Sequence, residues 1–400
     1  MLFLAPLLVL SSFIYVAMGD DLDAQVQFDN KPPPPAPPPE QKLVVAHFMV
    51  GNTYPYQVAD WSKDIILASS KGIDAFVLNV GRDEWQPKRV ADAFTAAQKS
   101  KTGFKLFLSF DMSSLPCATL ADATALRNYI ISYRSHPNQL IYPLGSGRLL
   151  VSTFAGEDCR FGQGSLQTAW HYALKGDPQL PDVYFVPSFF VDPLKFGELK
   201  IIDGAFHWNS AWPMGNYNAS FELDNLFLKN LGGKTYMAGI SPWFFTHYGP
   251  DTYNKNFIYR CDDWHFAARW ELIVKNRHMV DLAQVITWND FGESHYVGPI
   301  AGAQPMSEAW TKGFDHQDYL WAVALLPTPA AVTLSCGSSH SAETLPAGLS
   351  KMRLRLSTQC EVKVQIWRKD TLVMDFMPTG FRFNRNPVSY NFNAFVAVSP

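Results

Sequence analysis

Eight short apolar runs recur along the middle of the chain, each rich in β-branched or aromatic residues. The predicted strands are Leu43–Val50, Asp74–Val80, Lys105–Asp111, Leu149–Phe154, Val183–Phe190, Gly204–Asn209, Thr235–Ile240 and Gln284–Asn289. Helical spacing separates them, most clearly in Ala59–Ser70, Arg89–Ser100, Asp122–Tyr133 and Asp263–Met279. Eight strands that alternate with helices predict an α/β fold of the (β/α)8 barrel type. A doubly wound sheet is the alternative, which the lack of a Gly-rich fingerprint after the first strand disfavours.

The N-terminal region has a different composition. Residues 1–19 carry no charged side chain and end in a small-x-small pattern, which predicts a secretory signal peptide, with an uncleaved membrane anchor as the alternative. Residues 20–41 contain seven prolines within Lys31–Glu40 and are predicted to be a linker. We therefore expect a secreted protein, found outside the cell or in the cell wall. Asn218 begins the one Asn-x-Ser/Thr sequon and is the expected glycosylation site.

The barrel is predicted over residues 42–325, and the region that follows has a different sequence pattern. Alternating stretches such as Lys351–Leu356 and Val362–Trp367 predict a small β-sandwich over residues 326–400. Cys336 and Cys360 both lie in this region, and we predict that they form a disulfide. The lack of an obvious row of exposed aromatic residues favours capping of the barrel over ligand binding.

Charge and cysteine content limit the partners and cofactors. The formal net charge is −3 without a long basic run, so no nucleic-acid partner is expected. No His or Cys spacing is typical of a zinc site and no phosphate-binding loop is present, so neither a metal nor a cofactor is predicted. Separately, we expect the protein to be a monomer. Cys117 and Cys159 follow adjacent strands and are predicted to bridge two loops on one face of the barrel. Cys261 is left as an inert thiol.

The run Val285–Ser294 contains two candidate catalytic residues. It places Asp290 and Glu293 three residues apart beside Trp288, where an apolar strand breaks into a loop. Two carboxylates beside an aromatic ring suit glycosidic bond cleavage, which needs one protonated acid and one ionised base or nucleophile. Spacing alone does not say which residue is which; the longer side chain of Glu293 favours Glu293 as acid and Asp290 as base.

Other polar residues also cluster at the predicted carboxyl ends of the strands, where barrel enzymes place their active sites. They are His47, Asn79, Asp111, Thr153, Glu157, Trp208, Asn209 and Asn289. For any one of them, a simple turn-forming role is the competing interpretation. Five tryptophans are expected near the same face and would stack on sugar rings, although single tryptophans are more often in the core. They are Trp85, Trp208, Trp212, Trp243 and Trp288.

Several ordered motifs resemble the fungal α-1,3-glucanases called mutanases, glycoside hydrolase family 71. They are His47–Asn52, Gly72–Phe76, Ser109–Cys117, Ser152–Glu157, Val186–Phe190 and Trp288–Ser294. The resemblance implies an endo-acting, inverting hydrolase of the polysaccharide α-1,3-glucan, with a (β/α)8 barrel and a β-sandwich behind it. It also implies three catalytic carboxylates, Asp111, Asp290 and Glu293, the same three that the residues suggest. We expect sugar hydroxyls to be held by His47, Asn79, Glu157, Trp208 and Asn209, with Trp288 as a further substrate-binding residue.

The chain departs from the family pattern at His207 and Ala211, where the family more often has Asn and Gly, and we expect these changes to reshape a subsite. Two other functions compete. A secreted glucan-binding protein without activity would lose a carboxylate, whereas all three are present here. The second competing hypothesis is a retaining glycosidase of another family. Whether the protein remodels its own cell wall or digests another's is open.

Overall fold

A computed structural model of the 400-residue chain describes residues 42–215, 217–259, 261, 265–314, 329–346 and 360–377. The predicted signal peptide and proline-rich linker lie outside these residues, as does the predicted strand Lys351–Leu356. In the described residues, no helix has both the length and the apolar character needed to cross a membrane.

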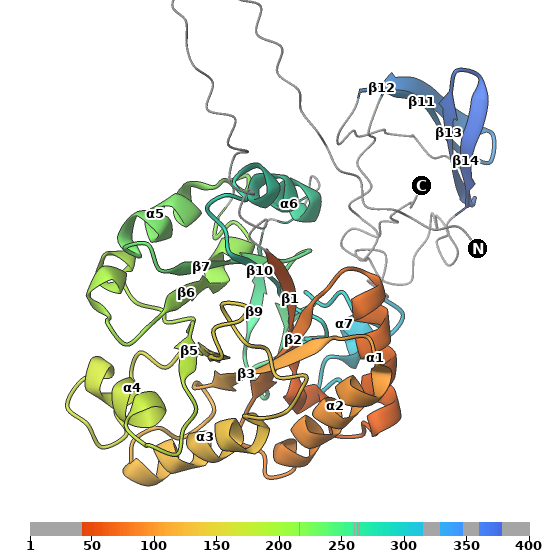
Figure 1. The fold of residues 1–400 in the computed structure, drawn as a ribbon. Helices are drawn as coiled ribbons and strands as arrows, with labels where there is room; N and C mark the ends of the chain where they lie inside the picture. The colour runs from red at the N-terminus through yellow and green to blue at the C-terminus, as the bar shows by residue number, and fades with distance from the viewer. Residues whose placement is uncertain are drawn as a thin grey trace, which may run out of the picture. The chain divides into compact units, whose positions relative to one another are not determined.

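Eight parallel strands form the central sheet (Figure 1). They are β1 (Leu43–Met49), β2 (Ala75–Val80), β3 (Lys105–Asp111), β4 (Leu149–Phe154), β5 (Val183–Phe185), β6 (Gly204–His207), β7 (Thr235–Ile240) and β10 (Leu282–Val285). Their order, β5-β4-β3-β2-β1-β10-β7-β6, follows the chain around a ring in which the last strand pairs with the first. Backbone hydrogen bonds from Asp203 N to Phe185 O (2.8 Å) and from Phe206 N to Pro187 O (2.9 Å) join the two remaining edges. The predicted (β/α)8 barrel is confirmed.

Helices surround this ring (Figure 1). They are α1 (Val58–Ser70), α2 (Gln86–Ser100), α3 (Leu120–Tyr133), α4 (Leu166–Lys175), α5 (Glu222–Asn230), α6 (His265–Lys275) and α7 (Glu308–Thr311), with the 3-10 turns η1 (Val50–Thr53), η2 (Pro193–Glu198) and η3 (Trp208–Ala211). Local sequence sets the helix starts. Thr119 and Asp122 form a capping box at α3, in which Thr119 N donates to the Asp122 carboxylate (2.7 Å). Pro87 stands in the first turn of α2, where its missing N–H removes no helical bond.

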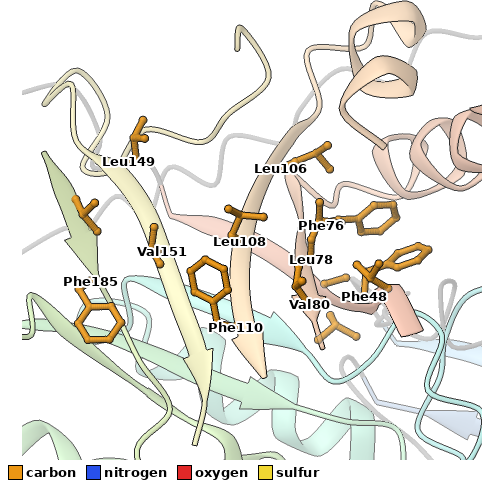
Figure 2. Close-up of a cluster of buried hydrophobic side chains, with 14 of the residues drawn as sticks. Phe48, Phe76, Leu78, Val80, Leu106, Leu108, Phe110, Leu149, Val151 and Phe185 are labelled. Carbon is orange, nitrogen blue, oxygen red and sulfur yellow. The ribbon is translucent and has the colours of Figure 1, made fainter. Parts of the chain in front are cut away.

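Side chains of the strands divide between two buried layers. One set faces the helices, and Figure 2 shows part of it on β1–β5, including Phe48, Phe76, Leu108, Val151 and Phe185. The other set contributes to a second apolar cluster, with Val45, Val77, Phe107, Leu150, Phe206, Met237 and Leu282. Two residues further along several strands, on the same side of the sheet, the buried side chains become polar: His47, Asn79, Ser109, Ser152 and Gln284. The barrel interior is thus a packed core whose polarity rises toward the carboxyl ends of the strands.

β1 ends at Met49, one residue before its predicted limit, and three predicted strands end two or more residues early. β5 stops at Phe185, just before Pro187, which has no N–H for the ladder. β6 stops at His207 because the chain turns into η3, where Ser210 Oγ donates to His207 O (2.7 Å). β10 covers Leu282–Val285 instead of Gln284–Asn289, since the residues that follow form the loop described below.

Two smaller sheets complete the described structure. β8 (Phe245–His247) and β9 (Asn256–Ile258) form a hairpin between β7 and α6, which was not predicted. A separate antiparallel sheet, ordered β12-β11-β13-β14, contains β11 (Ala330–Cys336), β12 (Ser339–Leu345), β13 (Val362–Arg368) and β14 (Thr371–Phe376). This sheet fits the predicted C-terminal β-domain.

Both predicted disulfides are present. Cys117 and Cys159 join the loops after β3 and β4, with Cα atoms 5.1 Å apart. Cys336 and Cys360 join residues of the C-terminal region, with Cα atoms 5.4 Å apart. Cys261 belongs to neither bridge.

We expect non-reducing peptide mapping to recover Cys117 linked to Cys159 and Cys336 linked to Cys360, with Cys261 as a thiol. Asn218, which is exposed, should be the one N-glycosylated residue. The bridge across 42 residues is expected to stabilise the fold by a few kcal/mol, roughly 3–4 by chain entropy. A Cys117–Cys261 peptide would overturn this pairing.

Candidate active site

Residues Thr287–His295, which follow β10, carry both predicted carboxylates; we call them the catalytic loop. Its start is tied to the end of β1, because Trp288 N donates to His47 O (2.7 Å). The buried side chain of Asn289 accepts from Met49 N (2.7 Å) and donates to Met49 O (3.0 Å). Asn289 is therefore a structural residue that fixes the backbone from which the carboxylates project.

The turn between the two carboxylates is also held by short-range contacts. Asp290 N donates to Thr287 Oγ1 (2.8 Å), and Glu293 N donates to Asp290 Oδ1 (3.1 Å). A side chain at position 292 would collide with the Tyr248 hydroxyl, so any residue other than glycine there requires Tyr248 to move. The Asp-Phe-Gly-Glu sequence thus folds into a turn that brings its two acids together.

Glu293 is held at both oxygens. His295 Nε2 lies 2.9 Å from Oε2, and Lys255 Nζ, on the hairpin, lies 3.6 Å from Oε1. His295 Nδ1 lies 3.2 Å from Thr287 Oγ1, a hydroxyl that already accepts the Asp290 amide. An ionised Glu293 can only accept, so His295 Nε2 carries the hydrogen of this contact and donates to Glu293, while Thr287 Oγ1 can bond to Nδ1 in either direction.

These surroundings move the pKa values of the two acids apart. Burial, together with the charge of Glu293, raises the pKa of Asp290 to about 6. Burial also acts to raise the pKa of Glu293, but the hydrogen bond and charge of His295 and the charge of Lys255 outweigh it and lower that pKa. At mildly acidic pH, Asp290 is the acid that keeps a proton and Glu293 is ionised. Such a divided pair is typical of acid–base catalysis.

Asp111 ends β3, as predicted, and is half-buried. Its Oδ1 accepts from Ser113 N (3.1 Å) and Ser113 Oγ (2.6 Å). Burial nevertheless raises its pKa. The charge of Lys255 acts on this carboxylate as well as on Asp290 and Glu293, so one cation favours the ionised form of all three predicted acids.

Asp290, Glu293 and His295 also offer three ligand atoms within 4.8 Å of one another. By spacing alone this would suit a small cation. However, His295 Nε2 is engaged with Glu293, and the ammonium of Lys255 would repel a metal ion. The donor set therefore fits acid–base work better than metal binding.

The other predicted binding residues differ in their access to solvent. Glu157 and Asn209 are half-buried, and Glu157 Oε2 accepts from Phe190 N (3.2 Å), which joins the loops after β4 and β5. Asn79 and Trp208 are buried, with 4% and 8% of their surface exposed. Glu157 and Asn209 thus remain the more accessible candidates for contact with a sugar.

Two predicted binding residues are buried and present almost no surface to a ligand. The indole of Trp288 is fully buried and packs against Phe76, with ring centroids 5.0 Å apart, so it belongs to the core. His47 is 1% exposed, its Nδ1 lies 2.9 Å from Gln284 Nε2, and burial lowers its pKa to about 3. Trp208 covers it edge-on at 5.0 Å. His47 therefore supports the floor of the site as an uncharged residue.

The expected ring of tryptophans is also incomplete. Trp212 is buried and stacks on His295 at 5.6 Å, while Trp85 and Trp243 are half-buried. The departure at His207 does not reshape the site directly, because its ring stacks on Phe227 of α5 at 3.6 Å in the layer outside the barrel.

Sequence reasoning missed Lys255 and His295. His295 had a local signal, since it lies two residues beyond Glu293 in a run of polar residues. Lys255 had none, because it reaches the site only through the hairpin β8–β9, whose strands are three residues long.

The fold and the chain have known relatives. The structure of a family GH99 endo-alpha-mannosidase from Bacteroides thetaiotaomicron is similar, with a TM-score of 0.52, 11% identity, and coverage of 70% of this chain and 94% of that one. In sequence, the chain is 41% identical over 308 residues to a glucan endo-1,3-alpha-glucosidase of Schizosaccharomyces pombe, covering 75% of this chain and 68% of the relative.

Two further relatives are a mutanase of Penicillium rubens (35% identical, 70% of this chain, 59% of the relative) and an ascus wall endo-1,3-alpha-glucanase of S. pombe (31%, 71% and 65%). The chain thus spans about 59–68% of the length of these relatives. The sequence model of glycosyl hydrolase family 71 matches residues 40–320. This chain belongs to glycosyl hydrolase family 71.

Proposed function

We propose that this protein is a secreted, endo-acting glycoside hydrolase that cleaves α-1,3-glucan. The observation that carries the proposal is the pair Asp290 and Glu293, which lies in one turn after the last barrel strand with pKa values moved in opposite directions. Relatives named for endo-1,3-alpha-glucan cleavage, one of them in an ascus wall, support the substrate and an extracellular location. Export itself follows from the predicted signal peptide.

In the proposed mechanism Asp290 is the general acid and protonates the departing glycosidic oxygen. Glu293, ionised between His295 and Lys255, is the base that takes a proton from the attacking water. This reverses the assignment expected from side-chain length, because the contacts of Glu293 favour its charged form. Asp111 is the third carboxylate that we expect the reaction to require.

The stereochemical course depends on the separation of the two acids. Inverting pairs stand about 6.5–9.5 Å apart so that a water fits on the face opposite the leaving group, whereas retaining pairs stand at about 5–5.5 Å. Here an oxygen of Asp290 lies within 4.8 Å of one of Glu293. Inversion, which the family resemblance implies, therefore requires these side chains to separate when substrate enters. We retain inversion because both acids sit on rotatable side chains and active-site contacts change on binding.

We expect the first product of an α-1,3-linked oligosaccharide to have a β-configured reducing end. Proton NMR, recorded before mutarotation mixes the anomers, checks this. An initial α-anomer would instead identify Asp290 or Glu293 as a nucleophile, which their close spacing would permit.

Product sizes test the endo-acting proposal. An endo-acting enzyme cuts within the polymer, so a ladder of oligosaccharides should appear before glucose. Chromatography of products from insoluble α-1,3-glucan at early times provides the measurement, with the Asp290→Asn protein as a blank. Release of one small sugar alone from the first time point would contradict internal cleavage.

A further inference from the structure

Lys255 contacts one of the three carboxylates, Glu293, and its charge acts on all three. Its ammonium lies 3.6 Å from Glu293 Oε1, and its side chain is 52% exposed, so it borders both the site and solvent. Its charge favours the ionised forms of Asp111, Asp290 and Glu293, which come from two separate elements, the end of β3 and the catalytic loop.

The hairpin holds Lys255 in this place. Tyr248 N donates to Lys255 O (2.8 Å) next to the β8–β9 pairing, which anchors the residue just before β9. Strand alternation then puts Lys255 and Tyr259 on the same face. Tyr259 stacks on Trp212 at 5.4 Å, and Trp212 in turn stacks on His295 at 5.6 Å.

A second tie runs through the backbone. Phe245 N, in β8, donates to the carbonyl of Glu293 (3.1 Å), and Trp243 Nε1 donates to the carbonyl of Ser294 (2.7 Å). The hairpin is therefore bonded to the catalytic loop on the side from which Lys255 approaches. These bonds hold the backbone of the hairpin against that of the catalytic loop, and from this position the Lys255 side chain reaches Glu293.

We propose that Lys255 is a positioning residue that sets the working pH of the site by compensating the charge of its three carboxylates. The inference rests on the proposed hydrolase function. The neighbouring charge of Glu293 opposes the ionisation of Asp290, and burial opposes the ionisation of all three acids. A nearby ammonium offsets these effects and orients Glu293 through Oε1, while His295 holds Oε2.

The titratable groups around this cation define what a substitution changes. Besides Lys255, the charged and titratable groups that interact with Asp290 or Glu293 are His295, Tyr248 and Tyr259. Removal of the Lys255 charge leaves the other groups in place. The pKa values of Asp290 and Glu293 then rise together, whichever of them is the acid.

The test is the pH dependence of kcat/KM on a soluble α-1,3-linked oligosaccharide. We expect Lys255→Met to move both limbs of the profile to higher pH, by roughly half a unit to one unit, as loss of a partly exposed charge at this distance implies. Lys255→Arg keeps the charge and should restore most of the wild-type profile. Lys63→Met is the matched control, because Lys63 pairs with Asp60 (3.1 Å) on the surface of α1 and should leave the profile unchanged.

A second readout does not depend on turnover. Carbon-13 NMR of labelled side-chain carboxyls, assigned by the signals lost in Asp290→Asn and Glu293→Gln, gives the two pKa values directly. A rise of these two pKa values in Lys255→Met supports the inference even if the wild-type protein proves inactive. Inactivity of the wild type would contradict only the proposed function. Unmoved carboxyl pKa values in folded Lys255→Met, or an equal shift in Lys255→Arg, would overturn the role of Lys255.

Discussion

Glu293→Gln and Asp290→Asn are each expected to lower kcat at least about a thousandfold while the protein stays folded. Acid and base assistance both act in the transition state, and loss of one commonly costs about a hundred- to ten-thousandfold. Asp111→Asn should be similarly damaging. Initial rates on α-1,3-glucan, compared at equal concentrations of folded protein, give the result.

Asp92→Asn provides a control, because this carboxylate lies in α2, where it pairs with Lys88 (3.2 Å) and Arg89 (3.0 Å) of the same helix. Its activity should equal that of the wild type. Near-normal turnover in a folded Asp290 variant would show that the catalytic loop is not the active site. Circular dichroism and the melting temperature establish that each variant is folded.

Arg269→Met is expected to destabilise the barrel by about 3–5 kcal/mol, the usual cost of leaving the partner of a buried ion pair uncompensated. Arg269 donates two hydrogen bonds to Asp224, at 2.7 and 2.6 Å, and both side chains are buried. Tyr236 also donates to Asp224 (2.6 Å), while Arg269 Nε donates to Gly239 O (3.0 Å). The pair joins α5, α6 and β7 outside the catalytic site.

Urea unfolding followed by tryptophan fluorescence gives the change. The double variant Asp224→Leu with Arg269→Met should recover part of the lost stability, since no buried charge remains unpaired. Lys63→Met, which removes an exposed pair, should leave the midpoint unchanged. An Arg269→Met protein as stable as the wild type would show that the pair contributes little.

The barrel was predictable because its signals are local and repeated. Strands β3, β4 and β7 have the predicted limits, since each is a short, mostly apolar run that polar or turn-forming residues follow. The acids were predictable for a related reason. Asp111 closes such a run, and the pair Asp290 and Glu293 stands where another breaks off.

What sequence reasoning missed depends on contacts between distant segments. Trp288 was expected to meet a sugar because it adjoins Asp290, but its side chain points into the layer that holds Phe76. β10 ends at Val285, so Trp288 belongs to the loop after the strand and not to the strand end where it was expected. Lys255 lies 38 residues before Glu293, so no local pattern connects them. The same holds for the pKa order of the acids, which depends on Lys255 and His295 rather than on side-chain length.

Linkage specificity tests the central claim most directly. The measurement is the release of reducing ends by the purified full-length chain from insoluble α-1,3-glucan, set beside β-1,3-glucan, starch and dextran at equal mass. The account predicts rapid release from α-1,3-glucan, background release from the other three, and background release from all four with Asp290→Asn. A folded wild-type protein that leaves α-1,3-glucan intact, or that cleaves starch or dextran equally fast, would contradict it.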